Sequence, residues 1–384
     1  MSADSNDEVN VLQLAIHGVL IGYLAGFRNG RNVLSIADTF KNDPDRPTFS
    51  LITHPAFPNA ARLMAAPWAR NQRLHPVLSN LLPEGSLREL IAQGLKVHVD
   101  NEFHILSYLG EDLPGAIEAT PMEPEDVPDY VLSTHGKARA VKFDKVTREN
   151  RFSLAGVQMK FSMKEKDGRY NLSRGDVLGD WIIKTPSTRH KFVPLNEYTA
   201  MSLAGLVGVD IPEIKLVELD KLDNLPQINL PDENQAFAIK RFDRDDNLRI
   251  HMEDFAQILV KYPHEKYTSA NYENIGKVIY DFSGDGLADA QQFARRLLVN
   301  ILLAINLGKT KEWYTVTMAH FQSWADKSGI PWRAIKPHLD DTMSKARELW
   351  PEALKALPMD EAHKEGLGAH WARLQDDFTI KAAK

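Results

Sequence analysis

Residues 152–163 read FSLAGVQMKFSM, two strand-like runs on either side of a turn of small residues. The next apolar run is WIIK at 181–184, and it ends on a lysine. A helix is predicted over 196–206, because a glycine and then a proline follow it and would end it. Further strands are predicted at 214–219 and 235–242. This part of the chain therefore predicts a mostly β unit with one long helix.

The chain before this unit mixes two periodicities. Apolar runs on both sides of His17-Gly18 predict a β-hairpin, and TFSLIT at 48–53 predicts a third strand. The spacing of leucine and isoleucine over 74–94 is helical. Residues 115–150 are polar, contain several prolines and have no sustained period, which predicts a linker. We therefore expect a small mixed subdomain ahead of the β-rich unit.

From Met252 onward the periodicity is helical. The expected domains are an N-terminal subdomain with linker at 1–150, a β-rich lobe at 151–245 and a helical C-terminal lobe at 246–384. The predicted fold class is α+β, with the two lobes of a protein-kinase-like fold and an accessory N-terminal subdomain. Layout by itself does not specify function, so the residues have to be weighed as well.

The composition is ordinary for a soluble globular protein. The 384 residues are 43% hydrophobic and 26% charged, which excludes a disordered chain. A net charge of −6 argues against binding nucleic acid through bulk charge. The chain has no cysteine, which excludes a disulfide scaffold, a zinc–thiolate site and a cysteine nucleophile. The first residues are acidic and polar, unlike a signal peptide, and no apolar run approaches the ~20 residues of a membrane helix. We expect a cytoplasmic protein.

Three places in the β-rich unit could carry chemistry. The turn from Ser153 to Lys160 would let backbone N–H groups approach phosphates, and the alternative is an ordinary hairpin. Lys184 closes an apolar strand, so its ammonium needs a polar partner: the phosphates of ATP, with Glu197 as counter-ion, or solvent. The run 240–244, KRFDR, follows another strand. Its backbone could hold adenine, and the alternative for its charged side chains is salt bridging between lobes.

These motifs together resemble the HipA family, the serine/threonine kinase toxins of bacterial toxin–antitoxin pairs. The likeness rests on FSLAGVQMK, WIIKTPS, NEYTAM, IKRFDR and HMEDFAQIL in that order, and on NLLPEGSLRELIA and FHILSYLGEDLPGAI near the N-terminus. It implies a kinase that uses ATP and Mg²⁺ and a protein substrate such as an aminoacyl-tRNA synthetase. It also implies a small, dimeric, HipB-like antitoxin that would supply the contacts with DNA.

The resemblance also implies roles for individual residues. Ser153 matches the serine that family members autophosphorylate, and Lys184 matches the lysine that contacts ATP, with Glu197 as its supporting ion pair. The hinge beside adenine matches Lys240, Arg241 and Phe242. The loop that covers ATP matches Ala155, Gly156, Val157, Gln158, Met159 and Lys160. The family pattern at Met159 is usually acidic, so the chain departs from it there.

The general base and the metal ligand of a kinase are not found. In the family they lie in a loop of the form N-x-D-x-H-x-K-N and a later Y-D motif, after a helix that matches FARRLLVNILL. Here the residues from Leu303 onward resemble a segment beyond both motifs, so about fifty residues are missing at Leu302–Leu303. Asp281-Phe282-Ser283 imitates D-F-G but precedes that helix, and we interpret it as a solvated helix cap. Asp340-Asp341 is interpreted as a solvated or capping pair.

Two explanations for the missing segment are left open. The sequence as written omits it, or the polypeptide lacks it and cannot transfer phosphate. We favour the first, because deleting a catalytic loop would expose core surface in the helical lobe. The second would make the chain a catalytically dead, kinase-fold partner that acts as corepressor with a DNA-binding antitoxin.

Overall fold

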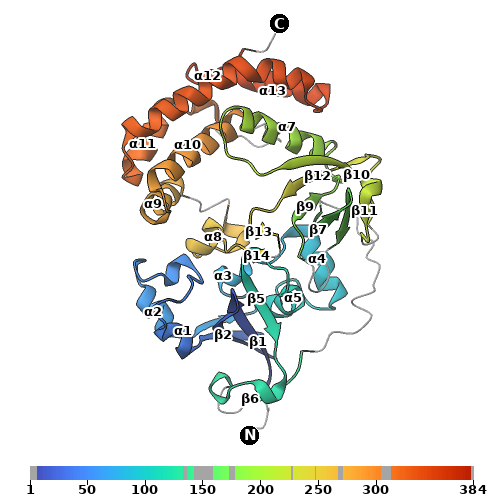
Figure 1. The fold of residues 1–384 in the computed structure, drawn as a ribbon, viewed down its shortest axis with the longest axis vertical. Coiled ribbons are helices and arrows are strands. Elements are labelled where there is room, and N and C mark those ends of the chain that lie inside the picture. Colours follow the sequence, from blue (N-terminus) through green and yellow to red (C-terminus); the bar gives the residue numbers. More distant parts are fainter. Residues whose placement is uncertain are drawn as a thin grey trace. The chain divides into compact units, whose positions relative to one another are not determined.

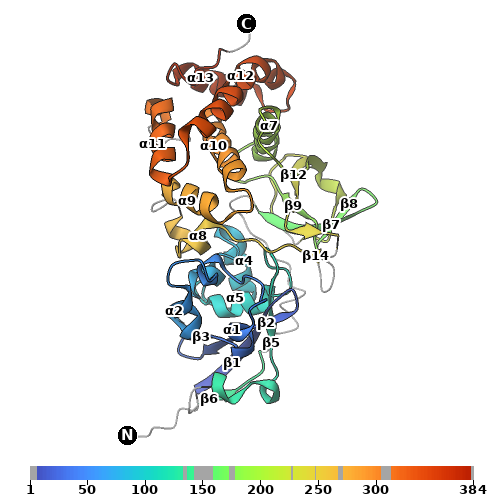
Figure 2. The same ribbon diagram turned by 60° about the vertical axis from the view of Figure 1, so that its left-hand side comes forward.

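The computed structural model describes residues 7–132, 136–141, 159–172, 178–225, 228–246, 248–266, 271–303 and 313–381. The chain divides into two compact units (Figures 1 and 2). Unit 1 comprises Met1–Ile182, Asp220–Leu230 and Arg241–Ser269, and unit 2 comprises Ile183–Leu219, Pro231–Lys240 and Ala270–Lys384. No helix in the described residues is long and apolar enough to cross a bilayer. The predicted domain limits at 150 and 245 stay predictions.

The N-terminal sheet of unit 1 is built on a hairpin. Strands β1 (Asp7–Ile16) and β2 (Val19–Phe27) pair antiparallel, with Ile16 opposite Val19. His17 and Gly18 between them have φ values of 50° and 75°, as a two-residue type I′ turn requires. The predicted hairpin is therefore confirmed. The sheet has the order β4-β3-β2-β1-β5, with β6 also paired to β1; its remaining strands are β3 (Arg31–Ile36), β4 (Trp68–Asn71), β5 (Ile117–Pro121) and β6 (Gly136–Ala138).

Short helices cover this sheet and share its core. Helix α5 (Glu102–Leu109) lies beside β5 in both ribbon views (Figures 1 and 2). The predicted helical stretch at 74–94 forms α3 (Pro76–Ser79) and α4 (Gly85–Gly94), interrupted at Pro83. The other helical segments before residue 132 are α1 (Asp38–Asn42), η1 (Leu51–Thr53), α2 (Ala60–Ala65), η2 (Pro124–Asp126) and η3 (Asp129–Val131).

Two sequence predictions in unit 1 are wrong. TFSLIT at 48–53 is not a strand, because it ends in the 3-10 turn η1. The backbone N–H of Leu51 bonds to the carboxylate of Glu253 at 2.7 Å instead of to a neighbouring strand. The expected linker at 115–150 contains β5 and β6, which pair with β1 more than a hundred residues earlier. Both errors arise because tertiary contacts override a local pattern.

A second sheet has the order β10-β12-β9-β7-β8-β11. Its strands are β7 (Lys160–Lys166), β8 (Arg169–Leu172), β9 (Trp181–Lys184), β10 (Ile214–Glu218), β11 (Leu222–Asp223) and β12 (Gln235–Lys240). In unit 1, β7 pairs antiparallel with β8, and β8 pairs parallel with β11. In unit 2, β10 pairs antiparallel with β12, with Ile214 opposite Ile239. The predicted strand at 181–184 is thus present with the same ends, and those predicted at 214–219 and 235–242 are present but end at Glu218 and Lys240.

Unit 2 is otherwise helical. Its helices are α7 (Val193–Leu206), α9 (Tyr272–Phe282), α10 (Gly286–Leu302), η6 (Trp313–Thr315), α11 (Met318–Ser328), α12 (Trp332–Ala356) and α13 (Glu361–Arg373). Helix α10 packs against α9 and α12, and α7 packs against α12 (Figures 1 and 2). One face of α12 is apolar and buried, and its members are Ile335, Leu339, Met343, Ala346 and Trp350.

The C-terminal end of α10 is held by α13. The last carbonyls of a helix have no partner within the helix. His370 Nε2 donates to the carbonyl oxygen of Ile301 at 2.8 Å, and the indole N–H of Trp371 donates to that of Leu302 at 2.9 Å. Tyr314 donates to the other ring nitrogen of His370 at 3.2 Å, which fixes the tautomer. The predicted break at Leu302–Leu303 therefore follows a helix end at which α13 holds the carbonyl oxygens of Ile301 and Leu302.

Candidate functional site

Lys184 and Glu197 meet in unit 2. Lys184 is the last residue of β9, and its Nζ donates to Oε2 of Glu197 on α7. Helix α7 begins at Val193, three residues earlier than predicted, so Glu197 lies on its second turn. The side chains are 31% and 27% exposed, so both charged ends remain partly open to solvent. A strand lysine thus has a helix carboxylate as its counter-ion, and one side left open for an anion.

An aromatic ring supports this lysine from the neighbouring strand. Lys184 Nζ lies 5.7 Å from the ring centroid of Phe237 on β12, which is 1% exposed. The face of an aromatic ring attracts a cation, so Phe237 favours a charged ammonium at this place. On α7, the side-chain oxygens of Asn196 and Thr199 are buried and have no hydrogen-bond partner in the described part of the chain.

Lys240 ends β12 and has a counter-ion of its own. Its backbone N–H donates to the carbonyl oxygen of Glu213 at 2.8 Å, and its Nζ lies 3.9 Å from the Glu213 carboxylate. The side chain of Lys240 is 51% exposed. Screening by solvent makes an ion pair of this kind weak. Lys240 therefore keeps a mobile positive charge at the end of its strand.

The other predicted ATP-contacting residues with described positions lie in unit 1. Met159 is 4% exposed, so any contact with a ligand would come from its backbone. Lys160 begins β7 and is exposed, and Phe242 is 64% exposed. The side chain of Arg241 is only 5% exposed. Five predicted residues, Ser153, Ala155, Gly156, Val157 and Gln158, lie outside the described residues.

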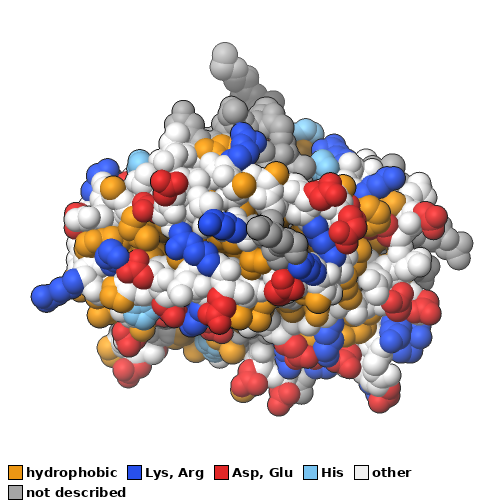
Figure 3. Space-filling model, turned by 90° about the horizontal axis from the view of Figure 1, so that it is seen from above, with side chains coloured by type: hydrophobic (Ala, Val, Ile, Leu, Met, Phe, Trp, Pro, Cys, Tyr) orange, Lys and Arg blue, Asp and Glu red, His pale blue; other side chains and the backbone are white. Residues whose placement is uncertain are grey.

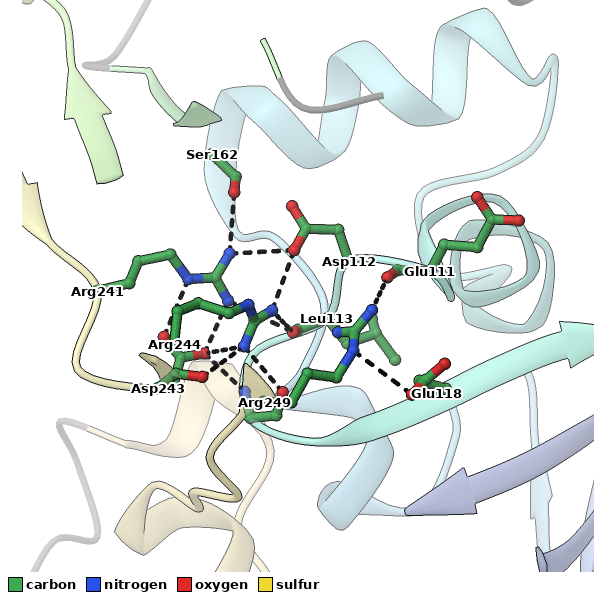
Figure 4. Close-up of polar contacts among 10 residues, drawn as sticks. Glu111, Asp112, Leu113, Glu118, Ser162, Arg241, Asp243, Arg244 and Arg249 are labelled. Atoms are coloured by element: carbon green, nitrogen blue, oxygen red, sulfur yellow. Dashed lines mark hydrogen bonds and ion pairs between the residues drawn. The ribbon is translucent and has the colours of Figure 1, made fainter. Parts of the chain in front are cut away.

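Arg241 belongs to a buried group that we call the arginine–aspartate cluster: Asp112, Arg241, Asp243 and Arg244 (Figure 4). Arg241 binds Asp243 through two hydrogen bonds, of 2.9 and 2.7 Å, and donates to Asp112 at 3.1 Å. Arg244 donates to Asp243 Oδ2 at 2.9 Å and to Asp112 Oδ1 at 3.0 Å. The guanidinium of Arg241 is therefore occupied by protein partners. The contacts of the Arg241 side chain therefore agree with the salt-bridging alternative rather than with ligand binding.

The cluster shifts the pKa values of its members. Burial by itself would raise the pKa of Asp243, but hydrogen bonds from Arg241 and from the backbone N–H of Gly115 outweigh it and leave the pKa below its usual range. Burial opposes the charge of Arg241 as well, yet its bonds to Asp243 and Asp112 raise its pKa. Burial and the charge of Arg241 lower the pKa of Arg244. Both carboxylates face guanidinium groups, so the cluster is a neutral set of charges.

Sequence reasoning missed the cluster although it quoted both of its motifs. The motif FHILSYLGEDLPGAI supplies Asp112, and IKRFDR supplies Arg241, Asp243 and Arg244. The first motif was used only to support a resemblance, whereas for the second salt bridging of the charged side chains was an alternative left open, without a partner named. The signal was the pair of charged residues in IKRFDR that follow a predicted buried strand. Nothing in the sequence places them beside a loop about 130 residues earlier.

The acidic residues considered as stand-ins for a catalytic base have structural partners. Asp281 lies near the end of α9 and pairs with Lys277 at 2.9 Å on the exposed helix surface. The N-cap of α10 is Asp285, not the 281–283 triplet. Asp341 binds Arg295 at 3.0 Å. No group of three or more His, Asp or Glu side chains suited to a metal occurs in the described residues. Asp281 and Asp341 are therefore engaged in ion pairs within the protein.

Comparison with known proteins decides the family. Residues 12–120 match the HipA N-terminal domain, and residues 152–306 match the HipA-like C-terminal domain. A putative kinase of Sinorhizobium fredii, Y4dM, is 36% identical over an alignment of 409 positions that covers 94% of this chain and 97% of the relative. The chain belongs to the HipA family. The serine/threonine-protein kinase toxin HipA of Shewanella oneidensis is 25% identical over 211 residues, which is 50% of this chain and 44% of that toxin.

A solved structure shows the same fold. It is the Shewanella oneidensis MR-1 complex of HipA, HipB and operator DNA, with a TM-score of 0.65 at 17% identity, covering 94% of this chain and 97% of that one. The likeness confirms the predicted α+β, kinase-like fold, with a β-rich N-terminal region and a helical C-terminal region. At the level of the family, this HipA-type chain resembles the kinases of toxin–antitoxin systems.

The alignment with Y4dM also bears on the missing segment. It is longer than this HipA-family chain, and 94% of the chain corresponds to only about 361 residues. About 48 aligned positions of Y4dM therefore have no counterpart here. That excess matches the size of the segment that the sequence predicts to be missing at Leu302–Leu303. The match to the C-terminal domain ends at residue 306, close to that point.

Proposed function

We propose that this chain is the toxin of a toxin–antitoxin module and a serine/threonine protein kinase that uses ATP. The observation that carries the proposal is the ion pair between Lys184 and Glu197. Protein kinases need a strand lysine and a helix glutamate in place to hold the phosphates of ATP. Under this proposal the loop at 155–160 covers the nucleotide, and Ser153 is the site of autophosphorylation.

The residues of unit 2 fit the phosphate end of a nucleotide. Glu197 and the ring of Phe237 hold the Lys184 ammonium in place, and under this proposal the ammonium would donate hydrogen bonds to phosphate oxygens. Phosphoryl transfer requires mainly positioning and charge stabilisation from a protein. The hinge beside adenine would be the backbone at 240–242, with Phe242 exposed next to it. Mg²⁺ and an aminoacyl-tRNA synthetase substrate remain expectations from the resemblance.

A separate observation favours a second candidate function. About 48 aligned positions of Y4dM have no counterpart in this chain, and neither the N-x-D-x-H-x-K-N motif nor the Y-D motif is found after FARRLLVNILL. A chain that lacks the general base would bind ATP without transferring phosphate. It would then act as a corepressor with a small DNA-binding antitoxin.

Both candidates include a HipB-like antitoxin as partner, and the complex of the structural neighbour supports this. The net charge of −6 disfavours strong direct binding to DNA phosphates. On the face that carries α12 and α13, basic and acidic side chains are interspersed (Figure 3). Examples are the pairs Lys336–Asp340 and Lys345–Asp341. We therefore propose that a dimeric antitoxin supplies most contacts with DNA.

The test separates nucleotide binding from phosphate transfer. Calorimetry on the full chain measures ATP affinity for the wild type, for Lys184→Ala and for the surface control Lys277→Ala, whose exposed pair lies on α9. Loss of a charged contact with phosphate should weaken binding about 10- to 100-fold in Lys184→Ala only. Mass spectrometry of the Ser153 peptide after incubation with ATP and Mg²⁺ then measures transfer.

Each result decides between the candidates. Binding together with a phosphate on Ser153 supports the kinase. Binding without any phosphate supports the dead corepressor. A wild type that does not bind ATP, or a Lys184→Ala variant that binds as well as the control, contradicts the assignment of Lys184 in both.

A further inference from the structure

The loop between α5 and β5 accepts hydrogen bonds from several arginine side chains of unit 1. It runs over residues 110–116, GEDLPGA. Its Asp112 carboxylate and the carbonyl oxygens of Glu111, Leu113 and Gly115 all receive hydrogen bonds from arginine side chains. Gly115 has a φ of 73°, and a Cβ there would lie 2.9 Å from the backbone nitrogen of Met252. Glycine at position 115 therefore lets a second stretch of backbone pass close to the loop, where a side chain would collide with it.

That second stretch is the segment 241–252, which also belongs to unit 1. Arg241, Arg244 and Arg249 point from it toward the loop (Figure 4). Arg244 donates to the carbonyl oxygens of Leu113 at 2.8 Å and Gly115 at 3.0 Å. In return, the backbone N–H of Gly115 donates to Asp243 at 2.8 Å. The segment is thus fastened to the loop by bonds in both directions.

Asp112 is the one carboxylate that the loop contributes to the cluster. A single oxygen, Oδ1, accepts from Arg241 at 3.1 Å and from Arg244 at 3.0 Å. The two guanidinium groups are 5% and 1% exposed, so water does little to solvate them. Without Asp112 they would share only Asp243, and one buried positive charge would be left uncompensated. Removal of one partner from such a group is strongly destabilising.

The side chain of Phe242 faces solvent although the residues on either side of it are held to the loop. Arg241 and Asp243, on either side of it, are 7% and 4% exposed, whereas Phe242 is 64% exposed. The backbone N–H of Arg241 also donates to the carbonyl oxygen of Asp180 at 2.8 Å. The backbone that carries Phe242 is therefore held in place on both sides of this residue. Its ring presents a flat, apolar surface, which suits a planar base.

We infer that Asp112 is a positioning residue for the base of the nucleotide. Through Arg241 and Arg244 it fixes the backbone at 241–243, which carries the ring of Phe242, where the base binds. This inference rests on the proposed ATP binding and extends it to the N-terminal subdomain, whose loop touches no nucleotide itself. The inference concerns the base alone, so the binding of an inorganic polyphosphate should not depend on Asp112.

The residue before Asp112 in the sequence provides a matched control. Glu111 precedes Asp112 in the same loop and has an exposed side chain, and the bond to Arg249 comes from its backbone oxygen. Glu111→Gln therefore removes one negative charge at nearly the same place without touching the cluster. Asp112→Ala removes the shared acceptor. Asp112→Asn keeps an acceptor oxygen and removes only the charge, so it should show a smaller loss in the same direction and is the fallback if the alanine variant fails to fold.

The experiment compares two probes on the full chain. Calorimetry measures the affinity for ATP and for inorganic tripolyphosphate, which has the phosphates but no base. Asp112→Ala should weaken ATP binding about tenfold or more, because binding must now order the backbone at 241–243. Tripolyphosphate binding should stay within about twofold of the wild type, and Glu111→Gln should leave both affinities within about twofold. Hydrogen exchange of the 241–250 amides should rise in Asp112→Ala alone.

Several results would overturn the inference. Unchanged ATP affinity in Asp112→Ala, despite faster exchange at 241–250, means that the cluster is only structural. Equal weakening of ATP and tripolyphosphate means general loosening of the protein. Failure of the wild type to bind ATP removes the proposed function as well, so the two failures are distinguishable.

Discussion

Replacement of Glu102 by alanine should lower the free energy of unfolding by about 3–5 kcal/mol. Glu102 begins α5, and its side chain is 0% exposed. One carboxylate oxygen accepts the backbone N–H of Leu74 at 2.7 Å. The other accepts from the hydroxyl of Ser79 at 2.9 Å and from Arg88 at 2.7 Å. The side chain thus joins α5 to three places on the preceding 30 residues.

The magnitude follows from what alanine leaves behind. Two buried neutral donors lose their acceptor, at about 1–3 kcal/mol each. The Arg88 side chain, 12% exposed, keeps its charge, with the Val99 carbonyl oxygen as its partner among the described residues. Relaxation of the surroundings recovers part of this sum, which gives the expected 3–5 kcal/mol. Glu89→Ala on the exposed surface of α4 is the control and should change stability by less than about 0.5 kcal/mol.

Urea unfolding gives the stability of the whole chain, and hydrogen exchange of the α5 amides reports on unit 1 by itself. In the double variant Glu102→Ala/Arg88→Ala, the total loss should be smaller than the sum of the single losses by at least about 1 kcal/mol, because the stranded charge has gone. A Glu102→Ala loss no larger than that of Glu89→Ala, or strict additivity in the double variant, would refute the reasoning.

Two further predictions concern unit 1. Burial, and then the charge of Arg70, lower the pKa of His75 to about 3, so the folded protein keeps this ring neutral while the unfolded chain protonates near pH 6.5. The unfolding free energy should therefore fall by up to about 1.4 kcal/mol per pH unit as pH drops below about 6.5 and approaches 3; His75→Asn, which keeps an N-cap acceptor, should flatten that slope in urea titrations at several pH values. An equal slope in the variant would contradict the assignment. A Cβ at Gly110 would lie 1.9 Å from the Ala119 carbonyl oxygen, whereas one at Gly284 meets nothing within 4 Å. Gly110→Ala should lower the thermal midpoint by an amount equivalent to about 1–3 kcal/mol or more, and Gly284→Ala should not; equal midpoints would show that the backbone at Gly110 yields easily.

Local patterns in the sequence predicted the parts of the fold that local patterns determine. The β1–β2 hairpin, helix α7 and strand β9 follow from spacing and from turn residues near in sequence. Strand β5 was taken for linker because its partner β1 lies about a hundred residues away. TFSLIT looked like a strand because its side chains are buried, but burial comes from the core of unit 1 and its backbone bonds to Glu253. Long-range partners of this kind leave no periodic signal.

The same distinction between local patterns and long-range partners applies to the residues of the candidate site. Lys184 and Glu197 are 13 residues apart, on a strand and the helix that follows it, so their meeting could be anticipated from the chain alone. Arg241 was assigned to the nucleotide because it matches the hinge beside adenine in the family that the chain resembles, yet its guanidinium belongs to a buried cluster with Asp112. Two charged groups separated by 129 residues cannot be paired from one sequence. Whether the backbone at 241 contacts a base stays a prediction.

The way α10 ends has an evolutionary consequence. His370 and Trp371 donate to the carbonyl oxygens of Ile301 and Leu302, so the end of this helix is held by residues 69 positions later in the chain. A change in the length of the connection after Leu303 would not remove these two bonds. Evolution can therefore act on the length of that connection separately from the hydrogen bonds that end the helix.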